Sequence, residues 1–109
     1  MRKLRLHTEA SQEAIEAAEW YERQRPGLGA DFQRAVDAAL DLIEEGIVPL
    51  GPVPSAAGAR GVKRLGLKRF PFDVMVVERR TEVVIIAFAH HARRPGYWRA
   101  RRRSSPAPR

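Results

Sequence analysis

Two helical patterns separated by only two residues constrain the fold of this chain more than any other feature. The first pattern runs through residues 8–25, where Thr8 is the expected N-cap, and the second begins near residues 27–29 and stops at Gly46. Apolar residues recur at intervals of three or four along the second pattern, at Leu28, Phe32, Val36, Ala39, Leu40 and Ile43. Because the Pro26-Gly27 break is so short, we expect an antiparallel helical hairpin whose apolar face must be covered.

We expect strands from the rest of the sequence to cover the apolar face of this helical hairpin. Lys3–His7 alternates polar and apolar residues, and Val62–Phe70, Phe72–Glu78 and Glu82–His90 are rich in residues that favour strands. Arg79–Thr81 is short enough to form a tight turn between the last two. The predicted order is therefore β-α-α-β-β-β, an α+β fold in which the helical hairpin packs on a small, mainly antiparallel sheet.

At 109 residues, the chain has room for one domain, which we assign to residues 1–98. Residues 46–61 contain three prolines and are expected to form a connecting loop. Residues 99–109 are rich in Arg and Pro and have almost no apolar content, so we expect a disordered tail. Such a tail can simply increase solubility, or it can contact nucleic acid or a protein partner.

The composition narrows the kinds of site that the chain can carry. There is no cysteine, so only three histidines and the carboxylates could bind a transition metal, and we expect neither a metal site nor a cofactor. No apolar run approaches the roughly 20 residues that span a bilayer, and the N-terminus lacks a signal-peptide core. We therefore expect a cytoplasmic protein that does not contact a membrane.

The net charge of +7 is unevenly distributed along the chain. Residues 1–59 carry 6 Lys/Arg against 10 Asp/Glu, a net charge of −4, whereas residues 60–109 carry 14 against 3, a net charge of +11. A basic half of this strength favours polyanionic partners such as nucleic acid, ribosomes or an acidic protein, without choosing among them.

An ordered set of short fragments extends over residues 3–98. They are Trp20-Tyr21-Glu22, Leu28-Gly29 with Phe32, Ala39-Leu40 with Ile43, Gly51-Pro52, Arg64 with Leu67-Lys68-Arg69-Phe70-Pro71-Phe72, Ala89-His90, Arg93-Arg94 and Pro95-Gly96-Tyr97-Trp98. In this order, and on these expected elements, the fragments resemble the RelE/ParE superfamily of toxins, particularly its ParE-like or plasmid-stabilisation branch.

The resemblance implies a growth-inhibiting toxin of a type II toxin-antitoxin system. A cognate antitoxin, acidic and ParD-like or similar, would hold it inactive, and the complex would bind operator DNA through the antitoxin. Members that resemble RelE cut messenger RNA on the ribosome without metal, whereas members that resemble ParE inhibit DNA gyrase. The third possibility is a nucleic-acid-binding module that has lost its toxicity.

The residues that could cleave RNA follow the last predicted strand. RNA cleavage requires a base for the ribose 2′-hydroxyl, an acid for the leaving oxygen and cations near the phosphate. The candidates are His90, His91, Arg93, Arg94 and Tyr97. The two histidines should point to opposite faces of a strand, so at most one can serve as base or acid. The alternative is that both histidines are structural, one packed and one solvated.

Asp73 favours the gyrase hypothesis, because the resemblance places an arginine at this position in the RNA-cutting members. A carboxylate there would repel the substrate. Target contacts are then expected from basic side chains on the strands together with the segment after the last strand. These residues are Lys63, Arg64, Lys68, Arg69, Arg93, Arg94 and Tyr97.

The antitoxin should bring an acidic, partly disordered segment that folds on the toxin. We expect it to lie across the helical hairpin and the sheet edge, and to cover Leu28 and Phe32. Among the aromatic residues, Trp98 is expected to close the edge of the domain, and Trp20 and Tyr21 to pack in the core or within the hairpin.

Overall fold

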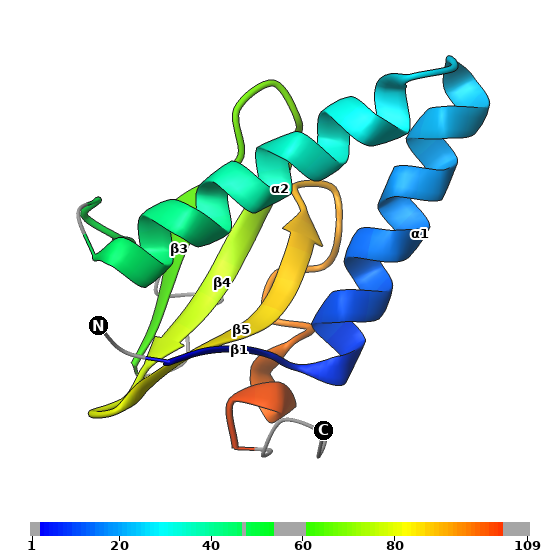
Figure 1. The fold of residues 1–109 in the computed structure, drawn as a ribbon. Coiled ribbons are helices and arrows are strands. Elements are labelled where there is room, and N and C mark those ends of the chain that lie inside the picture. The colour runs from blue at the N-terminus through cyan, green and yellow to red at the C-terminus, as the bar shows by residue number, and fades with distance from the viewer. Residues whose placement is uncertain (1–2, 47, 54–60, 104–109) are drawn as a thin grey trace.

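The computed structural model describes residues 3–46, 48–53 and 61–103. Within these residues, two α-helices lie on one face of a five-stranded sheet, and a short 3-10 helix follows the last strand (Figure 1). The helices are α1, Thr8–Gln24, and α2, Leu28–Glu45. No helix in the described part of the chain is long and apolar enough to cross a membrane.

Each helix begins and ends for local reasons. His7, rather than the expected Thr8, is the N-cap of α1, and its Nδ1 accepts a hydrogen bond from the backbone N–H of Glu9 at 3.2 Å. Gly46 ends α2 as predicted, because its φ of 72° lies in the left-handed region that glycine adopts without strain.

The turn between the helices is held by the carboxylate of Glu22. It accepts hydrogen bonds from the backbone N–H of Gly27 at 3.0 Å and from that of Gly29 at 3.0 Å. A Cβ at Gly29 would lie 2.6 Å from the backbone oxygen of Ala18, so only glycine permits the helices to approach so closely. The predicted helical hairpin is confirmed.

The sheet has the strand order β1-β5-β4-β3-β2. Its strands are β1 Lys3–Leu6, β2 Gly51–Pro52, β3 Val62–Gly66, β4 Phe72–Glu78 and β5 Glu82–His90. β1 pairs with β5 in parallel, and the other pairs are antiparallel, which confirms the mainly antiparallel sheet.

Two predictions about the strands were wrong. The expected loop at residues 46–61 contains β2, which is possible because the strand lies at the edge of the sheet, where a proline without an N–H is tolerated. The strand expected to run to Phe70 ends at Gly66, because the chain then turns: the N–H of Leu67 bonds to the carbonyl oxygen of Phe72, and Arg69 has a φ of 72°.

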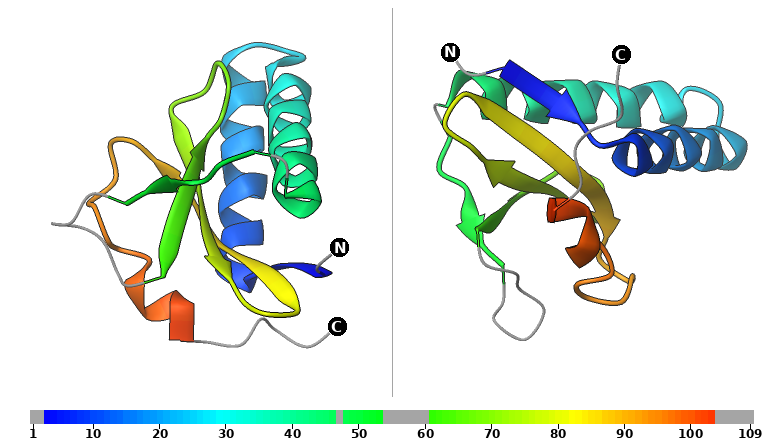
Figure 2. Two further views of the ribbon diagram at one scale, coloured as in Figure 1. Left: turned by 90° about the vertical axis from the view of Figure 1, so that its left-hand side faces the viewer. Right: turned by 90° about the horizontal axis from the view of Figure 1, so that it is seen from below.

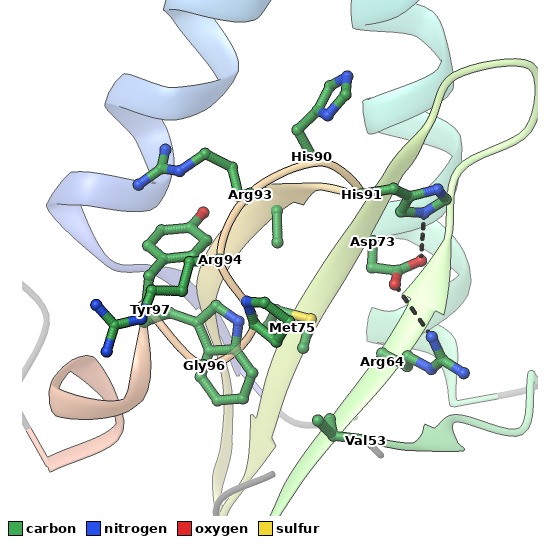
Figure 3. Close-up of a pocket in the computed structure, with 13 residues that line it drawn as sticks. Val53, Arg64, Asp73, Met75, His90, His91, Arg93, Arg94, Gly96 and Tyr97 are labelled. Atoms are coloured by element: carbon green, nitrogen blue, oxygen red, sulfur yellow. Dashed lines mark hydrogen bonds and ion pairs between the residues drawn. The ribbon is translucent and has the colours of Figure 1, made fainter. Parts of the chain in front are cut away.

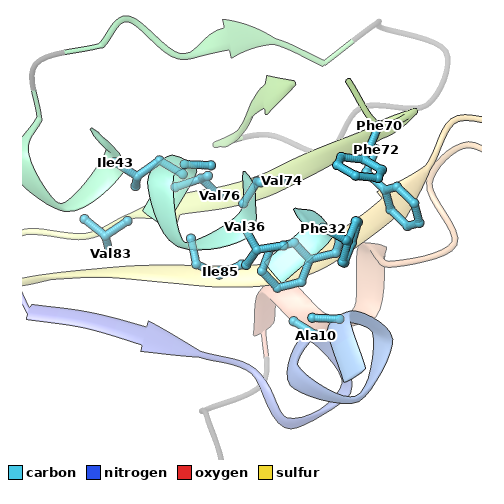
Figure 4. Close-up of a cluster of buried hydrophobic side chains, with 13 residues drawn as sticks. Ala10, Phe32, Val36, Ile43, Phe70, Phe72, Val74, Val76, Val83 and Ile85 are labelled. Carbon is cyan, nitrogen blue, oxygen red and sulfur yellow. The ribbon is translucent and has the colours of Figure 1, made fainter. Parts of the chain in front are cut away.

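Hydrophobic cores lie on both faces of the sheet. The larger core fills the space between the helices and the sheet, and Phe32 is at its centre with no exposed surface (Figure 4). The smaller core lies on the other face and is covered by Trp98, which is 2% exposed. The prediction for Trp98 as a packing anchor is thus confirmed. The expectation that Phe32 stays exposed for an antitoxin is wrong, because it packs against Phe70 and Phe72.

Adjacent aromatics on α1 have different environments. Tyr21 packs against Phe32 and Phe70, with ring centroids 5.2 and 4.9 Å away. Trp20 is 51% exposed, so of its two predicted places it does not take the one in the core, and its ring meets that of Tyr21 edge-on at 5.2 Å. Neighbouring residues on a helix point about 100° apart, so only one of the two can face the sheet.

The predicted tail begins with ordered structure. Arg99–Arg103 forms the 3-10 helix η1, which lies on the face of the sheet opposite the helical hairpin (Figure 2). Arg101 bonds to the backbone oxygen of Ile86 and to two glutamates of α1. The boundary at residue 98 is therefore too early, and residues 104–109 lie outside the described residues.

Candidate functional site

An open pocket of about 400 Å³ lies on the sheet face that the helices leave uncovered. One wall comes from β3, β4 and Val53, which follows β2, and the other comes from the end of β5 and the segment that follows it (Figure 3). The five residues expected in the site from this part of the chain, His90, His91, Arg93, Arg94 and Tyr97, all line the pocket.

Asp73 lies inside this pocket between the side chains of Arg64 and His91. One carboxylate oxygen is 3.3 Å from Nη1 of Arg64, and the other is 3.2 Å from Nε2 of His91 (Figure 3). The Asp73 side chain is 18% exposed. Arg64 also donates from Nε to the carbonyl oxygen of Pro52 at 3.1 Å, so its guanidinium is already engaged by the protein. The charge of Asp73 is therefore compensated within the protein. The Arg64 guanidinium that pairs with it is no longer available to a substrate phosphate.

His90 and His91 point in different directions, as their neighbouring positions predicted (Figure 3). The His90 ring packs edge-on against Phe72 at 5.0 Å, and its Nδ1 accepts a hydrogen bond from the N–H of Ala92 at 2.9 Å. Only His91 reaches Asp73. A carboxylate beside Nε2 orients the imidazole ring and leaves Nδ1 as the nitrogen that could accept a proton.

Tyr97 is engaged by neighbouring side chains at both its hydroxyl and its ring. The hydroxyl donates to Oε2 of Glu13 at 2.6 Å, and the Arg93 guanidinium lies 3.9 Å from the ring centroid. Burial raises the pKa of Tyr97 well above 10, and the hydrogen bond to Glu13 raises it further. Tyr97 is therefore a poor proton donor for a leaving group, and one face of its ring is covered.

Glu13 and Arg101 connect helix α1, strand β5 and the C-terminal segment. Oε1 of Glu13 accepts from the Phe88 N–H and from Nη1 of Arg101, both at 3.0 Å. Arg101 also donates to the carbonyl oxygen of Ile86 at 3.2 Å. β1 ends opposite Ile85, so β5 has no neighbouring strand on that side beyond this residue. The side chains of Glu13 and Arg101 there form hydrogen bonds to the backbone of β5, at the Phe88 N–H and the Ile86 carbonyl oxygen. They hold Tyr97 and Trp98 in the wall of the pocket.

Sequence reasoning missed Glu13 and Arg101. Glu13 is one of five glutamates on α1, and Arg101 was taken as part of the tail. A signal for Glu13 was present, because it follows Ala10 by three residues and precedes Ala17 by four, which places it beside the apolar face of the helix. Its partners, 75 to 88 residues away (Phe88 to Arg101), left no trace in local patterns.

The remaining predicted target contacts are dispersed. Lys63 forms an ion pair with Glu78 at 2.9 Å, and both line a second cavity beside α2 rather than the pocket. Lys68 and Arg69 lie in the turn between β3 and β4, where Arg69 is 3.7 Å from Asp31 of α2. Of the seven predicted residues, four line the pocket: Arg64, Arg93, Arg94 and Tyr97.

No cluster of three or more potential metal-ligating His, Cys, Asp or Glu side chains occurs among the described residues. Asp73 and His91 contact each other in the pocket, but the other side chain that pairs with Asp73 is the cationic Arg64.

Comparisons with known proteins identify the fold. No family model matches the chain, and no curated protein sequence is significantly similar. Among solved structures, the fold is similar to a chain of the "Chromosomal ParDE TA system from P. aeruginosa", with a TM-score of 0.70 and 16% sequence identity. The match covers 83% of this chain and 96% of that chain. This protein therefore has a RelE/ParE-like α+β fold, and the fold expected from the sequence resemblance is confirmed.

Proposed function

We propose that this protein is the toxin component of a type II toxin-antitoxin system and that a cognate antitoxin neutralises it in the cytoplasm. The main support is the fold, which is similar over nearly the whole length of a chain from a ParDE toxin-antitoxin (TA) system. A fold alone does not define a function, so the second support comes from the site: the sequence motifs around Tyr97 and the arginines after β5 meet in one pocket. Expression from a controlled promoter should stop growth, and co-expression of the cognate antitoxin, which we expect an adjacent reading frame to encode as a small acidic protein, should restore it.

We further propose that the toxin acts as a ParE-like inhibitor of DNA gyrase rather than as an enzyme. The supporting observation is that two polar groups of the pocket are already engaged: Tyr97 donates to Glu13, and Asp73 pairs with Arg64. A pocket whose tyrosine and arginine–aspartate pair are engaged by the protein itself suits binding better than cleavage of a phosphodiester.

Purified gyrase and relaxed plasmid test this proposal directly. The toxin should block supercoiling and cause cleaved plasmid to accumulate, while messenger RNA stays intact in a coupled translation reaction. Codon-positioned cuts in the messenger RNA, together with normal supercoiling, would refute the gyrase target.

A RelE-like ribosome-dependent endoribonuclease is the second candidate. The observation in its favour is the contact of 3.2 Å between His91 and Asp73, because a carboxylate-oriented imidazole can act as a general base beside Arg94. Single alanine variants at His91 and Arg94 should then lose toxicity while remaining folded. Retained toxicity in both variants excludes this candidate.

For the antitoxin, we propose an acidic ParD-like protein that binds operator DNA and covers the helical hairpin of the toxin near the adjoining sheet edge. Leu28 stays half-buried and keeps its proposed role, whereas Phe32 has no surface to offer. Ile15 and Trp20, each 51% exposed on α1, are the larger apolar groups of this hairpin that a partner can cover. Antitoxin contacts confined to residues 99–109 would contradict this arrangement.

A further inference from the structure

We propose that the pocket beside β5 binds an acidic segment of a gyrase subunit, with an apolar anchor residue in the pocket and carboxylates at its rim. This inference rests on the proposed gyrase target. It adds the surface of the toxin that binds gyrase and the kind of gyrase segment that this surface recognises. The pocket has a volume of about 400 Å³, which accommodates one or two side chains of a partner.

The base of the pocket is apolar although the chain around it is basic. Five apolar residues line it, from β4, β5, the position after β2 and the segment after β5: Val53, Met75, Ala89, Pro95 and Trp98. An apolar side chain from a partner would bury surface on both molecules, at about 25 cal/mol per Å². A cavity of this composition favours a protein segment with an apolar anchor.

The rim of the pocket supplies unneutralised positive charge. Arg94 is exposed and forms no ion pair with any of the described residues. The Arg93 guanidinium stacks on the ring of Tyr97, which leaves the in-plane N–H groups directed away from the ring. Both arginines line a pocket whose other lining side chains are largely apolar, and their charges are complementary to carboxylates that flank an apolar residue.

Nucleic acid fits this pocket less well for two reasons. Single-stranded bases bind by stacking on exposed aromatic faces, but Trp98 is 2% exposed and Arg93 covers a face of Tyr97. The Arg64 guanidinium inside the pocket is already paired with Asp73 and with the carbonyl oxygen of Pro52, so it is not available to bind a phosphate. Both features disfavour a polynucleotide, and neither hinders a carboxylate that binds at the rim.

The pocket is also preorganised for a partner. Glu13 binds Tyr97, Arg101 and the N–H of Phe88, so the wall formed by the C-terminal segment is tied to α1 and β5. A wall that is already ordered does not lose conformational freedom when a segment binds, which increases affinity for a given contact area.

Supercoiling inhibition by pocket variants tests the inference. Arg94→Glu reverses one rim charge, and Ala89→Leu fills the base of the pocket; we expect each to raise the concentration for half-inhibition at least tenfold. The matched controls are Arg80→Glu in the turn between β4 and β5 and Ala38→Leu on the exposed side of α2. They make the same changes in charge and volume away from the pocket and should inhibit like the wild type.

The results distinguish a wrong target from a wrong binding surface. If the wild-type protein leaves gyrase active, the proposed target is wrong and the inference fails with it. If the wild type inhibits and both pocket variants inhibit equally well, the target stands and the pocket is the wrong surface. Circular dichroism and thermal melting identify a variant that fails to fold, in which case the other pocket variant decides.

Photo-cross-linking determines the class of partner in the same complex. Ala92→p-benzoylphenylalanine, on an exposed position of the segment after β5 that leaves both rim arginines in place, should produce an adduct with a gyrase polypeptide when irradiated with gyrase holoenzyme and plasmid. The same replacement at Arg80 is the control and should give no such adduct. An adduct of the Ala92 variant with DNA would overturn the inference.

Discussion

Replacing Glu13 by alanine should destabilise this protein far more than its position on a glutamate-rich helix suggests. The carboxylate accepts hydrogen bonds from the Phe88 N–H at 3.0 Å, the Tyr97 hydroxyl at 2.6 Å and Arg101 at 3.0 Å. The side chains of Glu13 and Arg101 are only 15% and 14% exposed, so solvent screens their pairing weakly.

The magnitude follows from what the substitution leaves unpaired. Breaking a buried pair by removing one partner costs about 3–5 kcal/mol, and each partly buried donor left without an acceptor costs about 1–3 kcal/mol. Arg101 retains Glu9 at 2.9 Å and the carbonyl oxygen of Ile86 at 3.2 Å, which reduces the loss. We therefore expect Glu13→Ala to lower the free energy of unfolding by about 3 kcal/mol, and Glu13→Gln, which keeps an acceptor oxygen, by about 1–2 kcal/mol.

Urea denaturation followed by circular dichroism measures both values. Glu16→Ala is the matched control, because Glu16 is exposed on the same helix and bonds to the side chain of Gln12; it should change the stability by less than about 0.5 kcal/mol. If Glu13→Ala lies within about 1 kcal/mol of the wild type, the network does not hold the C-terminal segment as the structure indicates.

Three further outcomes are expected. Gly29→Ala should destabilise the hairpin by about 1–3 kcal/mol in the same denaturation assay, because the new Cβ would lie 2.6 Å from the oxygen of Ala18; wild-type stability would show that the helices separate freely. The pKa of Tyr97 is raised on folding, so its stabilising contribution is complete below pH 10 and decreases at higher pH. The free energy of unfolding of Tyr97→Phe should therefore fall less steeply above pH 10 than that of the wild type, and an equal slope in both proteins would contradict the raised pKa. Trp98→Ala should cost about 3–5 kcal/mol and Trp20→Ala less than about 1 kcal/mol, and the reverse order in thermal melts would contradict their assigned burial.

The local parts of the fold were predictable from the sequence. β4 and β5 have the predicted bounds, Phe72–Glu78 and Glu82–His90, because runs of β-branched residues on either side of a short polar turn favour a hairpin. The helical hairpin was predictable for a similar reason, since the Pro26-Gly27 break acts over a few residues. β2 was missed because two residues at an edge have no periodicity to detect.

The candidate site was predictable only in outline. The residues around the end of β5 were placed together because they are neighbours in sequence, and they do line one pocket. The state of each one depends on contacts across the chain: Asp73 is paired with Arg64 and contacts His91, and Tyr97 donates a hydrogen bond to Glu13. Pairings over 9 to 84 residues have no local signature.

By itself, then, the sequence determined the helices, the principal strands, the fold class and the basic character of the second half, because periodicity, turn residues and charge act over short distances. Only the tertiary structure decided which of two adjacent aromatics, Trp20 or Tyr21, faces the core, and that Phe32 is inaccessible. It also decided that Arg101 is part of the domain, tied to Glu13 on the first helix. The physical reason is that burial and hydrogen bonding depend on which surfaces the packed elements bring together.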